Sequence, residues 1–216
     1  MRGLNVFAAT AALAMLGALA ACTGAYYRAL ETVGIEKRDI LVDRIDDTRD
    51  AQDKAKEQFS SALEQYRSVV AFDGGDLEEV YDRLDAEYKK SERRARAVRE
   101  RIASVERVAK DLFDEWENEI GQYSDPNLAR RSRELLDETR TRYAGVIAAM
   151  HRAEETMDPV LTLFNDQVMF LRHNLNARAI GALEAELADL EQATATLVAE
   201  MERAIAEANR FIEDMA

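Results

Sequence analysis

The sequence predicts an all-α protein: an elongated antiparallel four-helix bundle with coiled-coil-like heptad packing, after a cleaved lipoprotein signal peptide. Three observations lead to this prediction. Helix-forming residues dominate the composition, and Pro126 and Pro159 are the only prolines. Apolar residues recur in alternating steps of three and four, which is the heptad spacing of packed helices. The resulting seams include Leu41, Phe59 and Tyr66 in the first helix, Leu84 in the second, Leu136 and Phe164 in the third, and Leu183 in the fourth. Short turns separate the helical stretches and place successive helices antiparallel.

An apolar leader precedes the helical region. Arg2 supplies a basic start, residues 4–21 are mostly Ala, Leu, Val, Phe and Met, and no acidic residue occurs before Glu31. A basic start, an apolar run and small residues before a cleavage point are typical of a secretory signal peptide. The run is at the short limit for crossing a bilayer, which takes about 20 residues. We therefore interpret residues 1–21 as a signal peptide.

The leader ends in Leu19-Ala20-Ala21-Cys22, which resembles the lipobox of bacterial lipoproteins. The resemblance implies that the Cys22 thiol, a strong nucleophile, receives a diacylglycerol. It also implies cleavage between Ala21 and Cys22 and acylation of the new amino terminus, for example with palmitate. Such anchoring is stable because each buried CH₂ contributes about 0.8 kcal/mol. The alternative is a plain signal peptide with an incidental cysteine. Cys22 is the only cysteine, so no disulfide within the chain competes for it.

The lipobox resemblance also implies a location. Thr23 follows Cys22, and the absence of Asp at this position favours the outer membrane in Gram-negative lipoproteins. We therefore expect a cell-envelope protein, anchored in the outer membrane by lipid and facing the periplasm. The net charge of −13 becomes −14 without Arg2. Such a charge disfavours nucleic acid as a partner and disfavours a basic surface that binds anionic lipid. The acylated terminus is thus the expected membrane contact.

The expected order of elements follows from the heptad phases and the turn signals. Residues 22–34 form a tether with a short helix, and residues 35–216 form the bundle, with helices at about 35–72, 76–120, 126–174 and 177–215. Asp73-Gly74-Gly75-Asp76 indicates a turn, because glycine accepts positive φ, and Asp76 with Glu79 resembles a capping box. Asp125-Pro126 suits a helix start, with Asp as the N-cap.

Two interruptions of the helices and one polar layer in the first seam modify this expected order. The heptad phase is unchanged across Asp158-Pro159, so we predict a kink at Pro159 and keep a true turn as the alternative. The phase changes near residues 174–176, which separates the third helix from the fourth. The seam of the first helix is weakest at Thr48 and Gln52. Tyr26-Tyr27 of the tether either lies at the lipid headgroups or packs on the base of the bundle.

Three segments resemble a known family. They are Gly34–Arg44 (GIEKRDILVDR), Ala55–Phe59 (AKEQF) and Phe170–Arg178 (FLRHNLNAR). They resemble Gram-negative envelope lipoproteins that are catalogued only as a domain of unknown function. The resemblance covers nearly the whole chain after the leader and implies an all-helical, coiled-coil-like domain. It implies no activity and supplies no catalytic residues.

Side chains able to carry chemistry are few and scattered. His151 and His173 do not have the spacing of metal ligands, and His173 is expected to stabilise a helix C-terminus. Adjacent carboxylates such as Glu154-Glu155 point in different directions on a helix. Trp116 is expected to pack in the core. The sequence contains no glycine-rich phosphate loop and no nucleophile elbow. We therefore expect no catalytic residues, no metal site and no cofactor.

The leading functional hypothesis is a non-enzymatic, lipid-anchored scaffold or protein-interaction module in the periplasm, with a protein partner or a second copy. A basic cluster is the candidate site for an acidic partner, and a solvated helix face is its alternative interpretation. The cluster consists of Lys89, Lys90, Arg93, Arg94 and Arg96.

The alternative hypothesis is a binding module for a small or lipidic ligand. A kink at Pro159 could open an apolar slot around Phe164, Met169 and Phe170. An enzyme is a third hypothesis, and a membrane-bending module is a fourth, which the acidic surface opposes.

Overall fold

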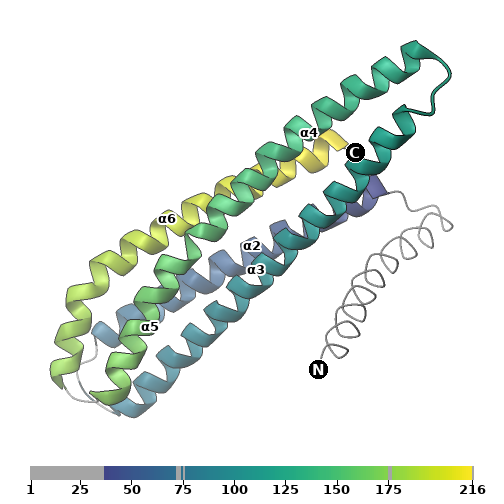
Figure 1. Ribbon diagram of the computed structural model, residues 1–216. Coiled ribbons are helices and arrows are strands. Elements are labelled where there is room, and N and C mark those ends of the chain that lie inside the picture. Colours follow the sequence, from purple (N-terminus) through teal and green to yellow (C-terminus); the bar gives the residue numbers. More distant parts are fainter. Residues whose placement is uncertain (1–36, 72–73, 75, 175–176, 216) are drawn as a thin grey trace, which may run out of the picture.

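The computed structural model describes residues 37–71, 74, 76–174 and 177–215. The described residues form the helices α2 (Lys37–Val70), α3 (Leu77–Ile120), α4 (Pro126–Glu155), α5 (Met157–His173) and α6 (Ala177–Met215). Helices α4 and α5 follow one another in nearly the same direction, so the helices form four antiparallel rods (Figure 1). The predicted all-α, four-helix bundle is therefore confirmed. The signal peptide, the Ala21-Cys22 cleavage and lipid site, and the tether at 22–34 lie outside the described residues.

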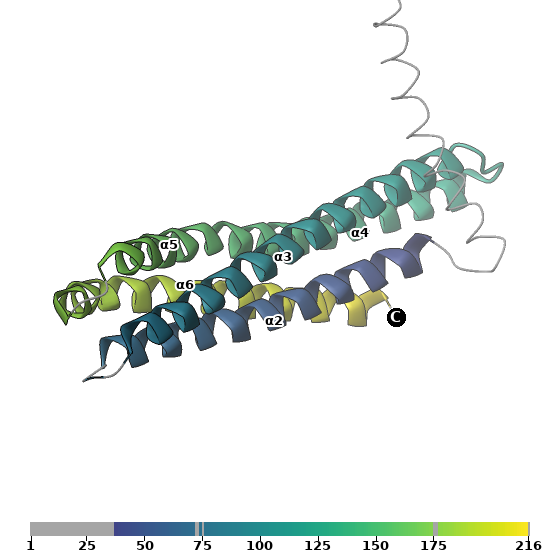
Figure 2. The ribbon, with the colours of Figure 1, turned by 90° about the horizontal axis from the view of Figure 1, so that it is seen from below.

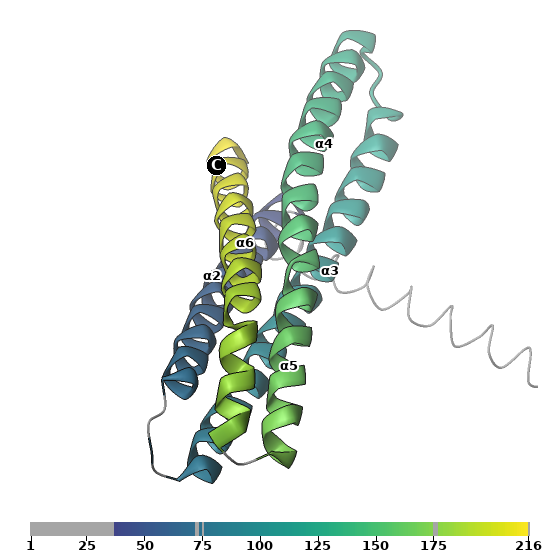
Figure 3. The same cartoon turned by 90° about the vertical axis from the view of Figure 1, so that its left-hand side faces the viewer.

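Each rod packs mainly on two neighbours. Helix α2 contacts α3 and α6, while α4 and α5 also pack on α3 and α6. The buried apolar side chains of the four rods form a single core cluster. Figure 3 shows the rods side by side along their lengths. Within the described residues, no helix is both long enough and apolar enough to span a membrane.

Most of the core consists of predicted seam residues, although Val80, Phe113 and Val160 are also buried and the predicted Trp116 is only partly buried. Leu41, Phe59 and Phe164 are completely buried, and burying a side chain of this size contributes about 1.5–3 kcal/mol. Tyr66 is also fully buried. Its hydroxyl donates to the main-chain oxygen of Leu183 at 2.9 Å, and its ring meets Phe164 edge-on at a centroid distance of 5.9 Å. Tyr66 thereby ties α2 to both α5 and α6.

The weak layer of the first seam is buried in the structure. Thr48 and Gln52 have no exposed surface. The Thr48 hydroxyl donates to the main-chain oxygen of Arg44 at 2.7 Å. In contrast, neither polar atom of the Gln52 side chain has a hydrogen-bond partner among the described residues. A buried polar group without a partner destabilises a fold by about 1–3 kcal/mol, so Gln52 is a weak point of the core.

The helix starts follow the predicted cap residues, with one difference. Asp76 accepts a hydrogen bond from the Glu78 amide at 2.9 Å, and Asp125 accepts one from the Asn127 amide at 2.8 Å. The expected reciprocal half of a capping box is not formed, because the Glu79 carboxylate instead pairs with Arg83 at 2.8 Å. Gly74 has a φ of +154°, which is a conformation that favours glycine.

The third rod breaks at Thr156, three residues before Pro159. Pro159 lacks an N–H group and cannot bond to the main-chain oxygen of Glu155, four residues earlier. This is where α4 ends. Thr156 keeps a helical backbone, with φ −77° and ψ −12°, and the chain continues in nearly the same direction (Figure 1). The break is therefore a kink within one rod and not a hairpin.

The hairpin of α3 and α4 extends beyond the other two rods (Figures 1 and 2). Lys37 at the start of α2 pairs with Glu115 at 2.7 Å, and Asp214 near the end of α6 pairs with Arg142 at 3.2 Å. Beyond these levels α3 and α4 pack on each other, for example where Trp116 Nε1 donates to Ser132 Oγ at 2.8 Å. We call residues 116–135 the tip.

Candidate interaction surfaces

His151 connects two helices. Its Nε2 lies 2.9 Å from Glu106 of α3 and its Nδ1 lies 3.0 Å from Glu154 of α4. Partial burial would lower the pKa of His151, but hydrogen bonds and charges from the two carboxylates outweigh burial and raise that pKa. The raised pKa favours the protonated imidazole, which connects α3 to α4 through the two carboxylates.

The remaining candidate chemical residues do not converge. His173 is the last residue of α5, as expected for a histidine at a helix C-terminus. Glu154 faces His151 while Glu155 is exposed, so the two carboxylates do not share a site. Trp116 is half-buried against the core. In the part of the chain that the structure describes, no group of three or more His, Cys, Asp or Glu residues is arranged to hold a metal ion.

The proposed slot residues near Pro159 are separated. Phe164 is fully buried against Tyr66, whereas Met169 and Phe170 are 49% and 38% exposed on the outside of α5. Val160, one residue after Pro159, is also fully buried. The kink thus lies over a filled core layer, and the structure does not bring these side chains together.

The basic cluster predicted from the sequence forms one surface of α3, which we call the basic face. It consists of Lys89, Lys90, Arg93, Arg94 and Arg96, all exposed. Residues 90, 93 and 94 have the i, i+3, i+4 spacing that places side chains on one side of a helix. Together with Gln58 of α2 they line a cleft of 320 Å³.

The basic face differs from most of the surface in its charge pairing. Lys89 pairs with Asp85 and Lys90 with Glu87, each at 2.6 Å, as do many other basic residues with acids three or four positions away. Within the described ranges, the side chains of Arg93, Arg94 and Arg96 make no ion pair or hydrogen bond.

A further cation extends the basic face onto α5. The hydrogen bond from Lys89 to Asp85 raises the pKa of Lys89, and the nearby charge of Arg172 opposes that shift. Like charges three or four residues apart destabilise a helix by about 0.2–0.5 kcal/mol per pair. The basic face therefore keeps an uncompensated positive charge within a strongly acidic protein.

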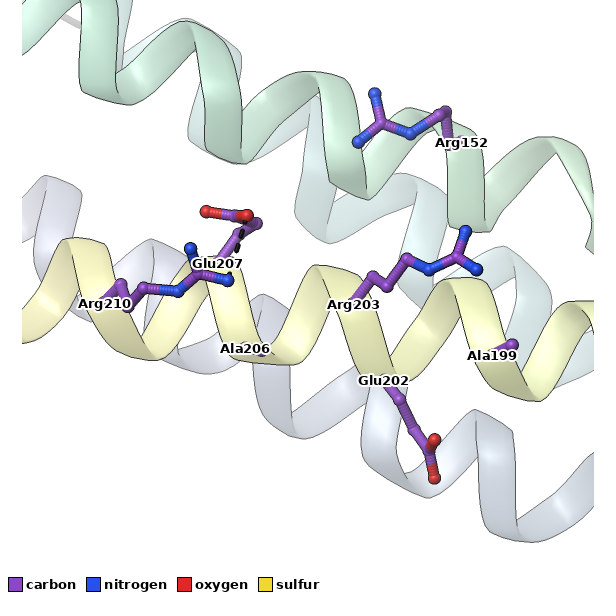
Figure 4. Close-up of a pocket in the computed structure, with 7 residues that line it drawn as sticks. All are labelled: Arg152, Ala199, Glu202, Arg203, Ala206, Glu207 and Arg210. Carbon is purple, nitrogen blue, oxygen red and sulfur yellow. Dashed lines mark ion pairs between the residues drawn. The ribbon is translucent and has the colours of Figure 1, made fainter.

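A second groove lies between α4 and α6 and has a volume of 390 Å³. Figure 4 shows Arg152 of α4 opposite Arg203 of α6, with Ala199 and Ala206 on the α6 side. Its arginines have acidic partners: Arg210 pairs with Glu207 at 3.1 Å, and Arg203 and Arg152 both approach Glu200. The positive charges of this groove are therefore better balanced within the protein than those of the basic face.

A third cleft, of 340 Å³, lies where α2 and α6 end against the base of the tip. Trp116, Leu135 and Met215 supply its apolar lining, and Arg38 and Arg142 are among its charged residues. The structure exposes apolar side chains of the tip that sequence reasoning did not single out. Tyr123 is 46%, Leu128 50% and Leu135 55% exposed. The heptad phase could have identified Leu128 and Leu135 as exposed, because each lies one position away from the seam that contains Leu136.

Comparison with known families places the chain. The model of the family described as "Protein of unknown function (DUF2959)" matches residues 26–215. The chain belongs to the DUF2959 family. The match includes all five described helices, and it confirms the resemblance stated from the sequence at the level of the family. A comparison with curated proteins finds no match. The surfaces of this DUF2959 protein must therefore be interpreted from their own chemistry.

Proposed function

We propose that this DUF2959 protein is a non-enzymatic, lipid-anchored scaffold of the cell envelope that binds an acidic protein through the basic face of α3. The observation that carries the proposal is the set of three exposed arginines, Arg93, Arg94 and Arg96, that have no partner in the described structure. Single exposed ion pairs contribute only about 0–1 kcal/mol, so a partner must engage several of these charges together.

The chemistry of the basic face favours a carboxylate-rich surface. Each guanidinium can bind a carboxylate with two parallel hydrogen bonds, a geometry that lysine does not offer. The charges lie on both sides of α3, toward Gln58 of α2 and toward Arg172 of α5. A surface of this width fits an acidic helix better than one small anion. Electrostatic attraction would also speed association and make it sensitive to salt.

The lipid anchor rests on the lipobox resemblance at Cys22. Fourteen residues separate Cys22 from Lys37 at the start of α2, and an extended chain of this length reaches at most about 50 Å. The proposed setting is the periplasmic side of the outer membrane. Cys22→Ser should release the protein from the membrane fraction, and unchanged fractionation would refute the anchor.

Affinity purification of the acylated protein from its own membranes tests the scaffold proposal. The triple substitution Arg93→Glu, Arg94→Glu and Arg96→Glu should lower recovery of the partner by roughly tenfold or more. A matched control reverses the same number of charges elsewhere on α3, at Arg83, Arg107 and Lys110, which are all exposed. The control should retain the partner. Equal recovery with both variants, or recovery of a lone monomer from the wild type, would contradict the proposal.

A further inference from the structure

We infer that the tip is a second membrane contact, in which Tyr123 and Leu128 enter the headgroup region of a phospholipid bilayer. This inference rests on the proposed anchoring at Cys22 and gives the anchored bundle a defined orientation. The exposed apolar side chains of the tip then contact the membrane to which the chain is already attached.

The position of the tip in the bundle favours contact with a lipid surface. The tip, the start of α2 and the end of α6 all lie at the same end of the bundle, whereas α5 ends at the opposite end (Figure 1). A chain anchored at Cys22 enters the bundle at Lys37, so the tip end is the end of the bundle attached to the anchored segment. Residues 126–135 of α4 account for about 14 Å of its length at 1.5 Å per residue. The segment between Cys22 and Lys37 is long enough for the tip to reach the bilayer.

The chemistry of the tip also fits a headgroup region. Every residue from 121 to 128 is exposed. Asp125 is the only charged residue of this stretch, and its carboxylate accepts a hydrogen bond from the Asn127 amide. An exposed tyrosine is favoured at the membrane interface, where its ring is apolar and its hydroxyl is hydrated.

Two arginines follow these apolar side chains along α4. Arg131 and Arg133 are exposed, and they make no ion pair within the described part of the chain, while their neighbour Arg130 pairs with Glu134 at 2.9 Å. Long basic side chains next to an inserted apolar segment can reach lipid phosphates. Residues 116–135 hold three arginines and four acidic residues, so the formal charge that a membrane meets at the tip is close to neutral and not the −13 of the whole chain.

Depth-dependent quenching tests the inference. Trp116 is the only tryptophan, so Trp116→Phe provides a background for two single-tryptophan variants. One carries Tyr123→Trp in the tip, and the matched control carries Phe170→Trp on the far end of the bundle. The acylated proteins are reconstituted in vesicles of phosphatidylethanolamine and phosphatidylglycerol with brominated acyl chains. Fluorescence at position 123 should fall by roughly twofold or more and shift to the blue, as expected for an interfacial ring, while position 170 should not change.

Two further measurements separate the possible failures. Vesicle flotation reports the anchor, so a protein that floats without quenching at position 123 keeps the anchor and overturns the tip contact. A protein that does not float overturns both. Hydrogen exchange of the unsubstituted protein avoids the Trp116 substitution: amides 121–128 should exchange more slowly with vesicles than in detergent-free solution. If they are protected equally without vesicles, protein covers the tip and the membrane contact is wrong.

Discussion

The four-rod body and the two-helix tip bury their apolar side chains to different extents. In the body, Phe59 and Phe164 have no exposed surface, whereas Leu128 and Leu135 in the tip are about half exposed. Among the described residues, α2 starts near the level of Glu115 and α6 ends near the level of Arg142, so neither helix covers α3 and α4 beyond these levels. Burial therefore depends on how far the neighbouring helices extend, and the uncovered side chains become available for an external contact.

The largest expected contrast comes from truncating one side chain in each region. Phe164→Ala should reduce the free energy of unfolding by about 3–5 kcal/mol, because it opens a cavity beside Tyr66. Leu128→Ala should change it by less than about 0.5 kcal/mol, because the side chain is already half in solvent. Urea unfolding followed by circular dichroism measures both. A loss at Leu128 as large as that at Phe164 would show that the tip is covered in solution.

A substitution in the polar layer of the body should change the free energy of unfolding by a smaller amount than Phe164→Ala and should raise it. Gln52→Met should raise the free energy of unfolding by about 1–3 kcal/mol, since it removes a buried amide without a partner and keeps a similar volume. Thr48→Val is the matched control on the same helix. Its hydroxyl already donates to the Arg44 main-chain oxygen, so the change should be smaller. Thermal unfolding of both variants provides the measurement, and a destabilised Gln52→Met would mean that the amide has a partner in solution.

The smallest expected effect is the pH dependence of the tie between α3 and α4. The folded state raises the pKa of His151 through Glu106 and Glu154. Its contribution to stability is therefore fully present below the unfolded value of about 6.5 and is lost as pH rises through the raised folded value. Wild type should exceed His151→Gln in stability at pH 5 and converge with it at pH 9. Glu106→Gln should reduce the difference, and a gap that widens toward alkaline pH would contradict this account.

Much of the fold was predictable because helix formation and seam position are local properties of the sequence. The seam residues Leu41, Phe59 and Leu84 are buried as the heptad phase predicts. The kink was predicted at Pro159, and the structure places it upstream at Thr156, because the missing N–H acts on the carbonyl four residues earlier. The grouping of Phe164, Met169 and Phe170 was not borne out by their positions, since three residues close in sequence can lie on opposite sides of a helix.

The candidate surfaces were predictable only in part. The basic face was visible as a run of Lys and Arg. Its pairing within α3 also follows from spacing, because Asp85 and Glu87 precede Lys89 and Lys90 by four and three residues, whereas no acid lies three or four residues from Arg93 or Arg94. The sequence could not show that no acid from a neighbouring helix reaches these arginines. The tip was not predicted, because its exposure depends on where α2 and α6 end relative to α3 and α4.

The sequence by itself determined the helical class, the positions of the turns and the stripe that each helix buries, because these follow from backbone preferences and from a repeat read along one chain. It also contains the lipobox-like end of the leader. Only the tertiary structure decided which charges stay unpaired and which apolar side chains stay exposed. These properties depend on the stagger of four rods against one another, and stagger is set by packing between residues that are distant in sequence.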